Sequence, residues 1–176
     1  MFSKMKDVLL RIEKTLFIIE EWVLVFGLTI MITFGTMQVL LRNFFNTGVE
    51  WADMLVRALV LWVGFLGASL ATRKSKHINI EIISKLITNP TLSKIRVRTV
   101  NAISFLIVLM LLKLSVDYTL LEASNNLYAF LKVPSWVVFI IVPISFSLIA
   151  LRLLIELILG GPIEKEEIRE IKEVEL

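Results

Sequence analysis

Long apolar runs, separated by short polar stretches, dominate this chain. Residues 22–41 carry no formally charged side chain, and a second run at 54–71 contains one, Arg57. A third run covers residues 99–116 and a fourth covers 134–159. An α-helix needs about 20 mainly apolar residues to cross the ~30 Å hydrocarbon core of a bilayer. The pattern therefore predicts an all-α integral membrane protein with four transmembrane helices.

The segments that flank these runs have patterns of their own. Residues 1–21 place apolar side chains at helical spacing between charged ones, so an amphipathic helix either lies on the membrane surface or leads directly into the first span. Residues 78–87 predict a second amphipathic piece at the interface. After Gly160-Gly161-Pro162, residues 163–176 are largely acidic. We divide the chain into an N-terminal segment (1–21), a membrane domain (22–159) and an acidic cytoplasmic tail (160–176).

Lysine and arginine are distributed unevenly among the polar segments. Residues 1–21 hold four of them and residues 72–98 hold seven, whereas residues 42–53 and 117–132 hold one each. Cytoplasmic loops of membrane proteins carry an excess of these two residues. The distribution predicts that both termini and the middle connection lie in the cytoplasm.

Composition supports a membrane protein and narrows its chemistry. Hydrophobic residues make up 57% of the chain, and its net charge is +3. A soluble domain has about 45–50% apolar residues. The basic residues are confined to particular loops, which indicates membrane topology and not a nucleic-acid partner. The chain has no cysteine and one histidine, and it lacks a phosphate loop, a catalytic triad or metal-spaced carboxylates. We therefore expect no enzyme, no catalytic, substrate or metal site and no cofactor.

Two residues of the second run are unusual for a membrane span. Arg57 is an ionisable group inside an apolar segment, and such groups usually face protein or a wet cavity. It either pairs with Asp53 or Glu50, or it contacts another subunit or a translocated anion. Trp62 lies too deep for an interfacial aromatic belt, which predicts that it fills a groove in the protein.

Small residues and scattered charges supply further candidates. Gly64, Gly67, Ala68 and Ala71 allow a close helix contact, either within the four-helix unit or with a partner. His77 either belongs to a turn or contacts a lipid headgroup, or else it makes a specific contact to a partner protein. One helical turn separates Arg152 from Glu156, and this spacing predicts a local ion pair.

The order of motifs from Val39 to Glu81 resembles one family, the DctQ-like small membrane subunit of TRAP (tripartite ATP-independent periplasmic) transporters. The matching features are the Arg42-Asn43-Phe44 turn, Trp51 with Asp53 and Arg57, Trp62 followed by Phe65-Leu66-Gly67-Ala68, then Arg73, and His77-Ile78 before Glu81. Pro134, Trp136 and Pro143 in the fourth run also match. The resemblance covers essentially the whole chain.

The resemblance implies a non-catalytic subunit in the cytoplasmic (inner) membrane of a bacterium or archaeon. A large membrane subunit would carry the substrate and sodium sites and move in an elevator-like manner. A periplasmic binding protein would deliver a carboxylate such as an organic or sugar acid. The small subunit would extend the static scaffold among membrane lipids. Its family-motif or partner-interface residues would be Arg42, Trp51, Asp53, Arg57, Trp62, Gly64, Gly67, Ala68, Arg73 and His77.

A different class of transporter remains as an alternative. A homodimeric four-helix exporter could work alone and couple protons through Glu20 or Glu21. Both acids precede Trp22 at the cytoplasmic edge of the first run, where we expect them to be solvated at the interface. The exporter hypothesis requires one of these acids at membrane depth.

Overall fold

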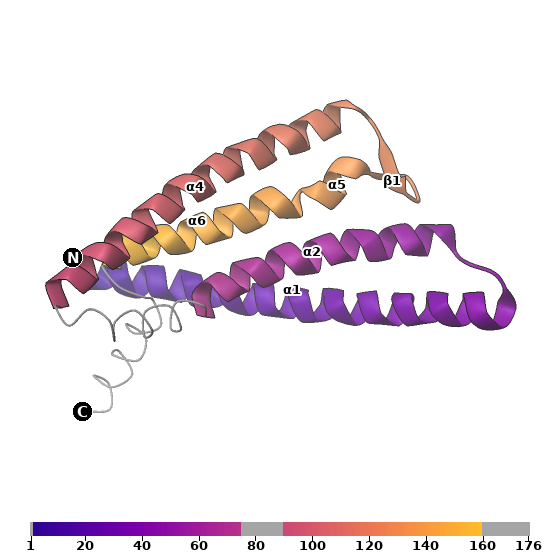
Figure 1. The fold of residues 1–176 in the computed structure, drawn as a ribbon, viewed down its shortest axis with the longest axis horizontal. Helices are drawn as coiled ribbons and strands as arrows, with labels where there is room; N and C mark the ends of the chain where they lie inside the picture. Colours follow the sequence, from indigo (N-terminus) through magenta and orange to yellow (C-terminus); the bar gives the residue numbers. More distant parts are fainter. Residues whose placement is uncertain (1, 75–89, 160–176) are drawn as a thin grey trace.

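The computed structural model describes residues 2–74 and 90–159, and within them the side chains of residues 8–72 and 98–158. Most of these residues are helical (Figure 1). The predictions for the side chains of Arg73 and His77, for the interfacial piece at 78–87 and for the tail at 160–176 concern parts of the chain outside the described residues.

The first helix, α1 (Phe2–Phe45), is a single element of 44 residues. At 1.5 Å per residue it is about 66 Å long, well beyond the thickness of a hydrocarbon core. Residues 2–21 therefore continue directly into the first apolar run, the second of the two predicted alternatives. The helix ends at Phe45, and the next residue, Asn46, has a φ of 50° in the left-handed region that asparagine tolerates. The Thr47 N–H then donates to the Leu41 carbonyl at 3.4 Å.

The second helix, α2 (Glu50–Lys74), runs back along α1. Its first turn is acidic, with Glu50 and Asp53, which suits the positive end of the helix dipole. The Val49 carbonyl accepts the N–H groups of Ala52 and Asp53, so the helix begins immediately after a four-residue turn.

The third long helix, α4 (Pro90–Ser124), is followed by a feature that the sequence did not predict. Strands β1 (Tyr128–Phe130) and β2 (Val133–Pro134) form a short antiparallel ribbon, so the fold is not purely helical. Leu131 and Lys132 at its tip have φ values of 43° and 66°. Both central residues of a type I′ turn need such values, and they usually are glycine or asparagine.

The fourth apolar run forms two helices, α5 (Ser135–Phe139) and α6 (Ile141–Leu159), and not the one predicted over 134–159. Pro143 explains the break near Ile140. Proline has no N–H, so the Phe139 carbonyl lacks its donor four residues later. The N–H of Ile144 still bonds to the Ile140 carbonyl at 3.3 Å, which keeps the two pieces nearly continuous.

The long helices are arranged so that α1 packs on α2, α2 on α6, and α6 on α4 (Figure 1). The span formed by α5 and α6 is the most enclosed: 39% of its apolar stretch is buried, against 6–11% for the other three spans. Large apolar side chains such as Trp22, Phe26 and Met110 are about 70% exposed on the outer surface. The predicted set of four helices long and apolar enough to cross a membrane is confirmed, over Val8–Phe45, Glu50–Thr72, Arg98–Ser124 and Ser135–Ile158.

Two ends of this assembly are named below. The terminal end is where α1 begins and α6 ends, and the loop end carries the α1–α2 turn and the β1–β2 ribbon (Figure 1).

Candidate functional site

A buried arginine joins three helices toward the terminal end. Arg152 of α6 is 3% exposed. Its Nε donates to Glu13 Oε1 at 3.2 Å, and its Nη2 donates to both carboxylate oxygens of Glu20 at 2.9 and 3.0 Å. Its Nη1 donates to the backbone carbonyl and the hydroxyl of Ser69. A guanidinium has five N–H donors, and all five are satisfied here. We call Arg152, Glu13, Glu20 and Ser69 the arginine cluster.

The helices bring the cluster together through simple spacing. Glu13 and Glu20 lie seven residues apart on α1, two turns along one face. That face meets α6, while Ser69 approaches from α2. The expectation that Glu20 is solvated is wrong. Its side chain is 4% exposed, and its carboxylate accepts hydrogen bonds from Arg152 and Ser69. Glu21, one residue on, is exposed as expected.

The predicted local pair of Arg152 and Glu156 is also wrong. The guanidinium of Arg152 is occupied by α1 and α2. Glu156 instead accepts a hydrogen bond from Asn101 Nδ2 of α4 at 3.2 Å, and both residues are buried. Side-chain bonds thus connect α6 to each of the other long helices.

The arginine cluster has the properties of a structural tie. It holds two carboxylates and one guanidinium, and no group of three His, Cys, Asp or Glu in the described parts of the chain could hold a metal ion. A buried charge is tolerated only when it is paired and its hydrogen-bonding groups are satisfied. In the cluster all five donors of Arg152 are bound, and these bonds fix α1, α2 and α6 to one another.

Sequence reasoning missed Glu13 and Ser69 in this cluster. The available signal was the pair of acids, seven residues apart, on a helix face that is otherwise apolar, together with an arginine inside the fourth run.

A second polar arrangement fixes the α1–α2 turn at the loop end. Gln38 is 4% exposed; its Nε2 donates to the Val49 carbonyl, and its Oε1 accepts the Val49 N–H at 3.2 Å. Arg42 forms an ion pair with Asp53 across the two helices. The predicted pairing of Arg57 with Asp53 or Glu50 is therefore wrong. Arg57 is exposed and makes no hydrogen bond or ion pair with any described residue.

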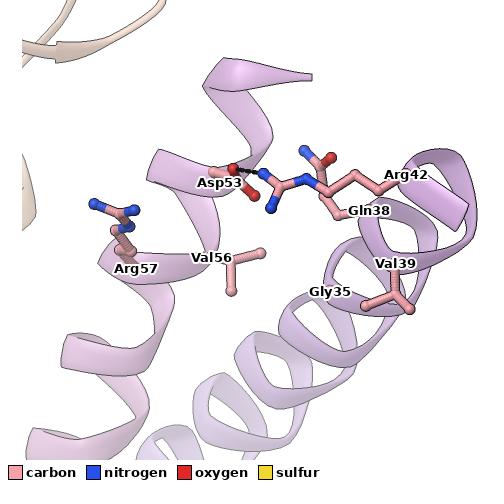
Figure 2. Close-up of a pocket in the computed structure, with 7 residues that line it drawn as sticks. All are labelled: Gly35, Gln38, Val39, Arg42, Asp53, Val56 and Arg57. Carbon is pink, nitrogen blue, oxygen red and sulfur yellow. Dashed lines mark hydrogen bonds and ion pairs between the residues drawn. The ribbon is translucent and has the colours of Figure 1, made fainter. Parts of the chain in front are cut away.

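These residues surround a pocket between α1 and α2. The pocket has a volume of about 280 Å³ and is lined by Gly35, Gln38, Val39, Arg42, Asp53, Val56 and Arg57. Figure 2 shows Arg42 reaching from α1 to Asp53, while the guanidinium of Arg57 stands on the opposite side of α2. We call this the two-arginine pocket.

The small residues of α2 divide between two faces. A side-chain carbon at Gly67 would contact Leu24 of α1 at 3.7 Å, so Gly67 serves packing within the chain. A carbon at Gly64 would meet no described atom within 4 Å. Ala68, one turn on, is exposed as well. Gly64 and Ala68 therefore form an unfilled strip on the outer surface of α2, which we call the small-residue strip.

The two predicted tryptophans pack inside the chain. Trp62 donates its indole N–H to the Val138 carbonyl of α5 at 3.0 Å and borders an apolar pocket of about 180 Å³. This agrees with the expectation that it fills a groove in the protein. Trp51 contacts Phe34 of α1 edge to face, with ring centroids 5.8 Å apart.

Comparisons with known proteins point to a single family. Residues 17–160 match the model of the DctQ component of tripartite ATP-independent periplasmic transporters. A segment covering 39% of the chain is 37% identical over 71 residues to the sialic acid TRAP transporter permease protein SiaT of Haemophilus influenzae strain 86-028NP. A segment covering 27% is 34% identical over 47 residues to a putative TRAP transporter small permease protein of H. influenzae strain Rd. The matches span 11% and 29% of those two proteins.

Proposed function

This chain belongs to the DctQ family, the small permease component of tripartite ATP-independent periplasmic transporters, and from that premise we propose its role in the complex. It is a multi-pass membrane protein and a transporter component, not an enzyme. Its proposed role is a non-catalytic scaffold in the inner membrane. It holds a large sodium-coupled elevator subunit, which takes up a carboxylate from a periplasmic binding protein. The match to a permease named for sialic acid supports an acidic sugar or organic acid as that substrate.

The small-residue strip is the observation that carries this proposal. Gly64 and Ala68 face outward and are not filled by any described side chain of this protein. Membrane helices associate where small residues let two backbones approach closely. Three other motif residues hold α2 in position: Gly67 and Trp62 pack inside the chain, and Asp53 joins α2 to α1. A helix of the large subunit is the proposed occupant of the strip.

Copurification tests the scaffold role directly. A tagged chain, extracted in mild detergent, is expected to bring down a large many-spanning protein. Gly64→Leu fills the strip and should abolish that capture. The matched control is Gly35→Leu, because a carbon at Gly35 also meets no described atom within 4 Å but lies on α1. Equal capture by both variants would remove the strip from the interface, and solute uptake by vesicles holding this chain alone would end the scaffold proposal.

The proposed topology places the terminal end in the cytoplasm, as the lysine and arginine distribution predicts. The segments 1–21 and 160–176 then flank the membrane domain 22–159 on the cytoplasmic side. The chain has no cysteine, so single-cysteine variants report sidedness cleanly. Thr47→Cys should react with an impermeant maleimide added outside intact cells, and Lys14→Cys should not. The reverse pattern would invert the topology.

The arginine cluster opposes the alternative of a self-contained proton-coupled exporter. A proton-coupling carboxylate must exchange protons with water, whereas Glu20 is 4% exposed and bound by Arg152 and Ser69. Glu21, the next residue of α1, is exposed. A loss of solute efflux in Glu21→Gln would revive the exporter.

A further inference from the structure

The two-arginine pocket has a cationic rim and an apolar floor. Arg42, Asp53 and Arg57 supply the charged part of its lining, and Gly35, Val39 and Val56 supply the apolar part. Gly35 lies seven residues before Arg42 on α1, about 10 Å deeper along the helix. The pocket lies on the outer surface, where its lining residue Val39 is 60% exposed. A ligand for this pocket therefore needs a polar head at the loop end and an apolar body toward the middle of the helices.

The charge at the rim is not balanced within the described chain. Asp53 neutralises Arg42 through their ion pair. Arg57 is exposed and has no partner among the described residues, so the lining carries one net positive charge. A cation inside an apolar segment is costly unless it reaches water or an anion. Arg57 contributes to the lining of the pocket, and Figure 2 shows its guanidinium on the side of α2 away from Arg42.

We propose that the two-arginine pocket binds one anionic phospholipid, with the phosphate at Arg57 and an acyl chain along Gly35, Val39 and Val56. A phosphodiester carries one negative charge and accepts paired hydrogen bonds from a guanidinium. Basic pockets between membrane helices bind lipid headgroups on this principle. The apolar lining favours a lipid over a carboxylate side chain of a partner protein, because only the lipid has an acyl chain to fill it. This inference is independent of the scaffold role.

Native mass spectrometry of the delipidated full chain, with any subunits that copurify, tests the proposal. The probe is phosphatidylglycerol, with phosphatidylcholine of the same chains as the uncharged comparison. One phosphatidylglycerol should bind in preference to phosphatidylcholine. Arg57→Gln should lower its affinity roughly fivefold, the effect of one basic residue near a headgroup. The matched control is Lys113→Gln, which removes an exposed cation from α4, away from the pocket.

A second pair of variants tests the shape of the pocket and not its charge. Gly35→Leu fills the floor and should lose the bound lipid while still capturing the large subunit. Gly64→Leu should retain the lipid while losing the large subunit. The lipid site is overturned if Arg57→Gln and Lys113→Gln bind phosphatidylglycerol equally. It is also overturned if Gly35→Leu binds lipid normally while Arg57→Gln does not. In that case Arg57 would bind the anionic headgroup without any acyl chain in the pocket.

Discussion

Arg152 and Arg57 are both arginines inside apolar helical segments, and the protein treats them in opposite ways. Arg152 is 3% exposed, and every one of its donors binds a group of the same chain. Arg57 is exposed and binds no described group. Removing a partner from a buried ion pair costs far more free energy than breaking an exposed one. The comparison separates a cation that holds the fold together from a cation that is available to something outside the chain.

The largest expected effect follows from removing the buried cation. Arg152→Met leaves Glu13 and Glu20 without their shared partner. We expect the free energy of unfolding, measured by SDS titration in mixed micelles, to fall by about 3–5 kcal/mol. Adding Glu13→Gln and Glu20→Gln to Arg152→Met removes the uncompensated charges and should recover most of the loss. If Arg152→Met unfolds like the wild type, the cluster does not stabilise the fold.

Neighbouring glutamates give an internal control for the same cluster. Glu20→Gln keeps the shape of the side chain but removes the charge that binds Arg152. The free energy of unfolding should fall by about 1.5–3 kcal/mol, the range for a hydrogen bond to a charged group. Glu21→Gln should change it by less than about 0.5 kcal/mol, because Glu21 is exposed. Equal effects of the two variants would contradict the burial of Glu20.

The ion pair at the loop end should contribute much less. In the Arg42–Asp53 pair the side chains are 61% and 34% exposed. Exposed pairs contribute about 0–1 kcal/mol, so Asp53→Asn should lower the free energy of unfolding by no more than that. Raising the salt concentration should reduce the difference further. Glu50→Gln in the same helical turn serves as the control, and a loss of several kcal/mol for Asp53→Asn would show that the turn depends on this pair.

The smallest expected effect belongs to Arg57. Arg57→Gln should leave the free energy of unfolding within about 0.5 kcal/mol of the wild type in lipid-free detergent. Added phosphatidylglycerol should stabilise the wild type more than the variant, since a ligand that binds only the folded state stabilises it. A stability loss for Arg57→Gln in the absence of lipid would mean that this arginine already has a partner within the chain.

The four apolar helices could be predicted from the sequence because their signal is local. Residues 22–41 carry no charge, and this pattern requires no knowledge of other segments. The break near Ile140 was missed, although Pro143 marks it. The β1–β2 ribbon was missed because the sequence carries no local signal for it. Its turn residues, Leu131 and Lys132, are not those that usually adopt positive φ values, so nothing local indicated a hairpin.

The pairing of charges could not be predicted, because it is decided by helix packing. Arg152 has an acid one turn away, yet it bonds to residues 132 and 139 positions earlier. Asp53 likewise has Arg57 one turn away and bonds to Arg42 of the preceding helix. Spacing along one helix shows which charges could meet, whereas the neighbouring helix shows which ones do. The face of α2 that carries Gly64 was left open for the same reason.

The arginine cluster also has a consequence for the order of events during synthesis. Glu13 and Glu20 precede their counter-ion by 139 and 132 residues. At a translation rate of about 5–20 residues per second, both acids wait roughly 7–28 s before Arg152 has been made. During that time α1 cannot adopt its final buried surroundings. The surroundings of the first helix are therefore completed only by the last one, and a ribosome that stops before α6 leaves both carboxylates without the Arg152 guanidinium.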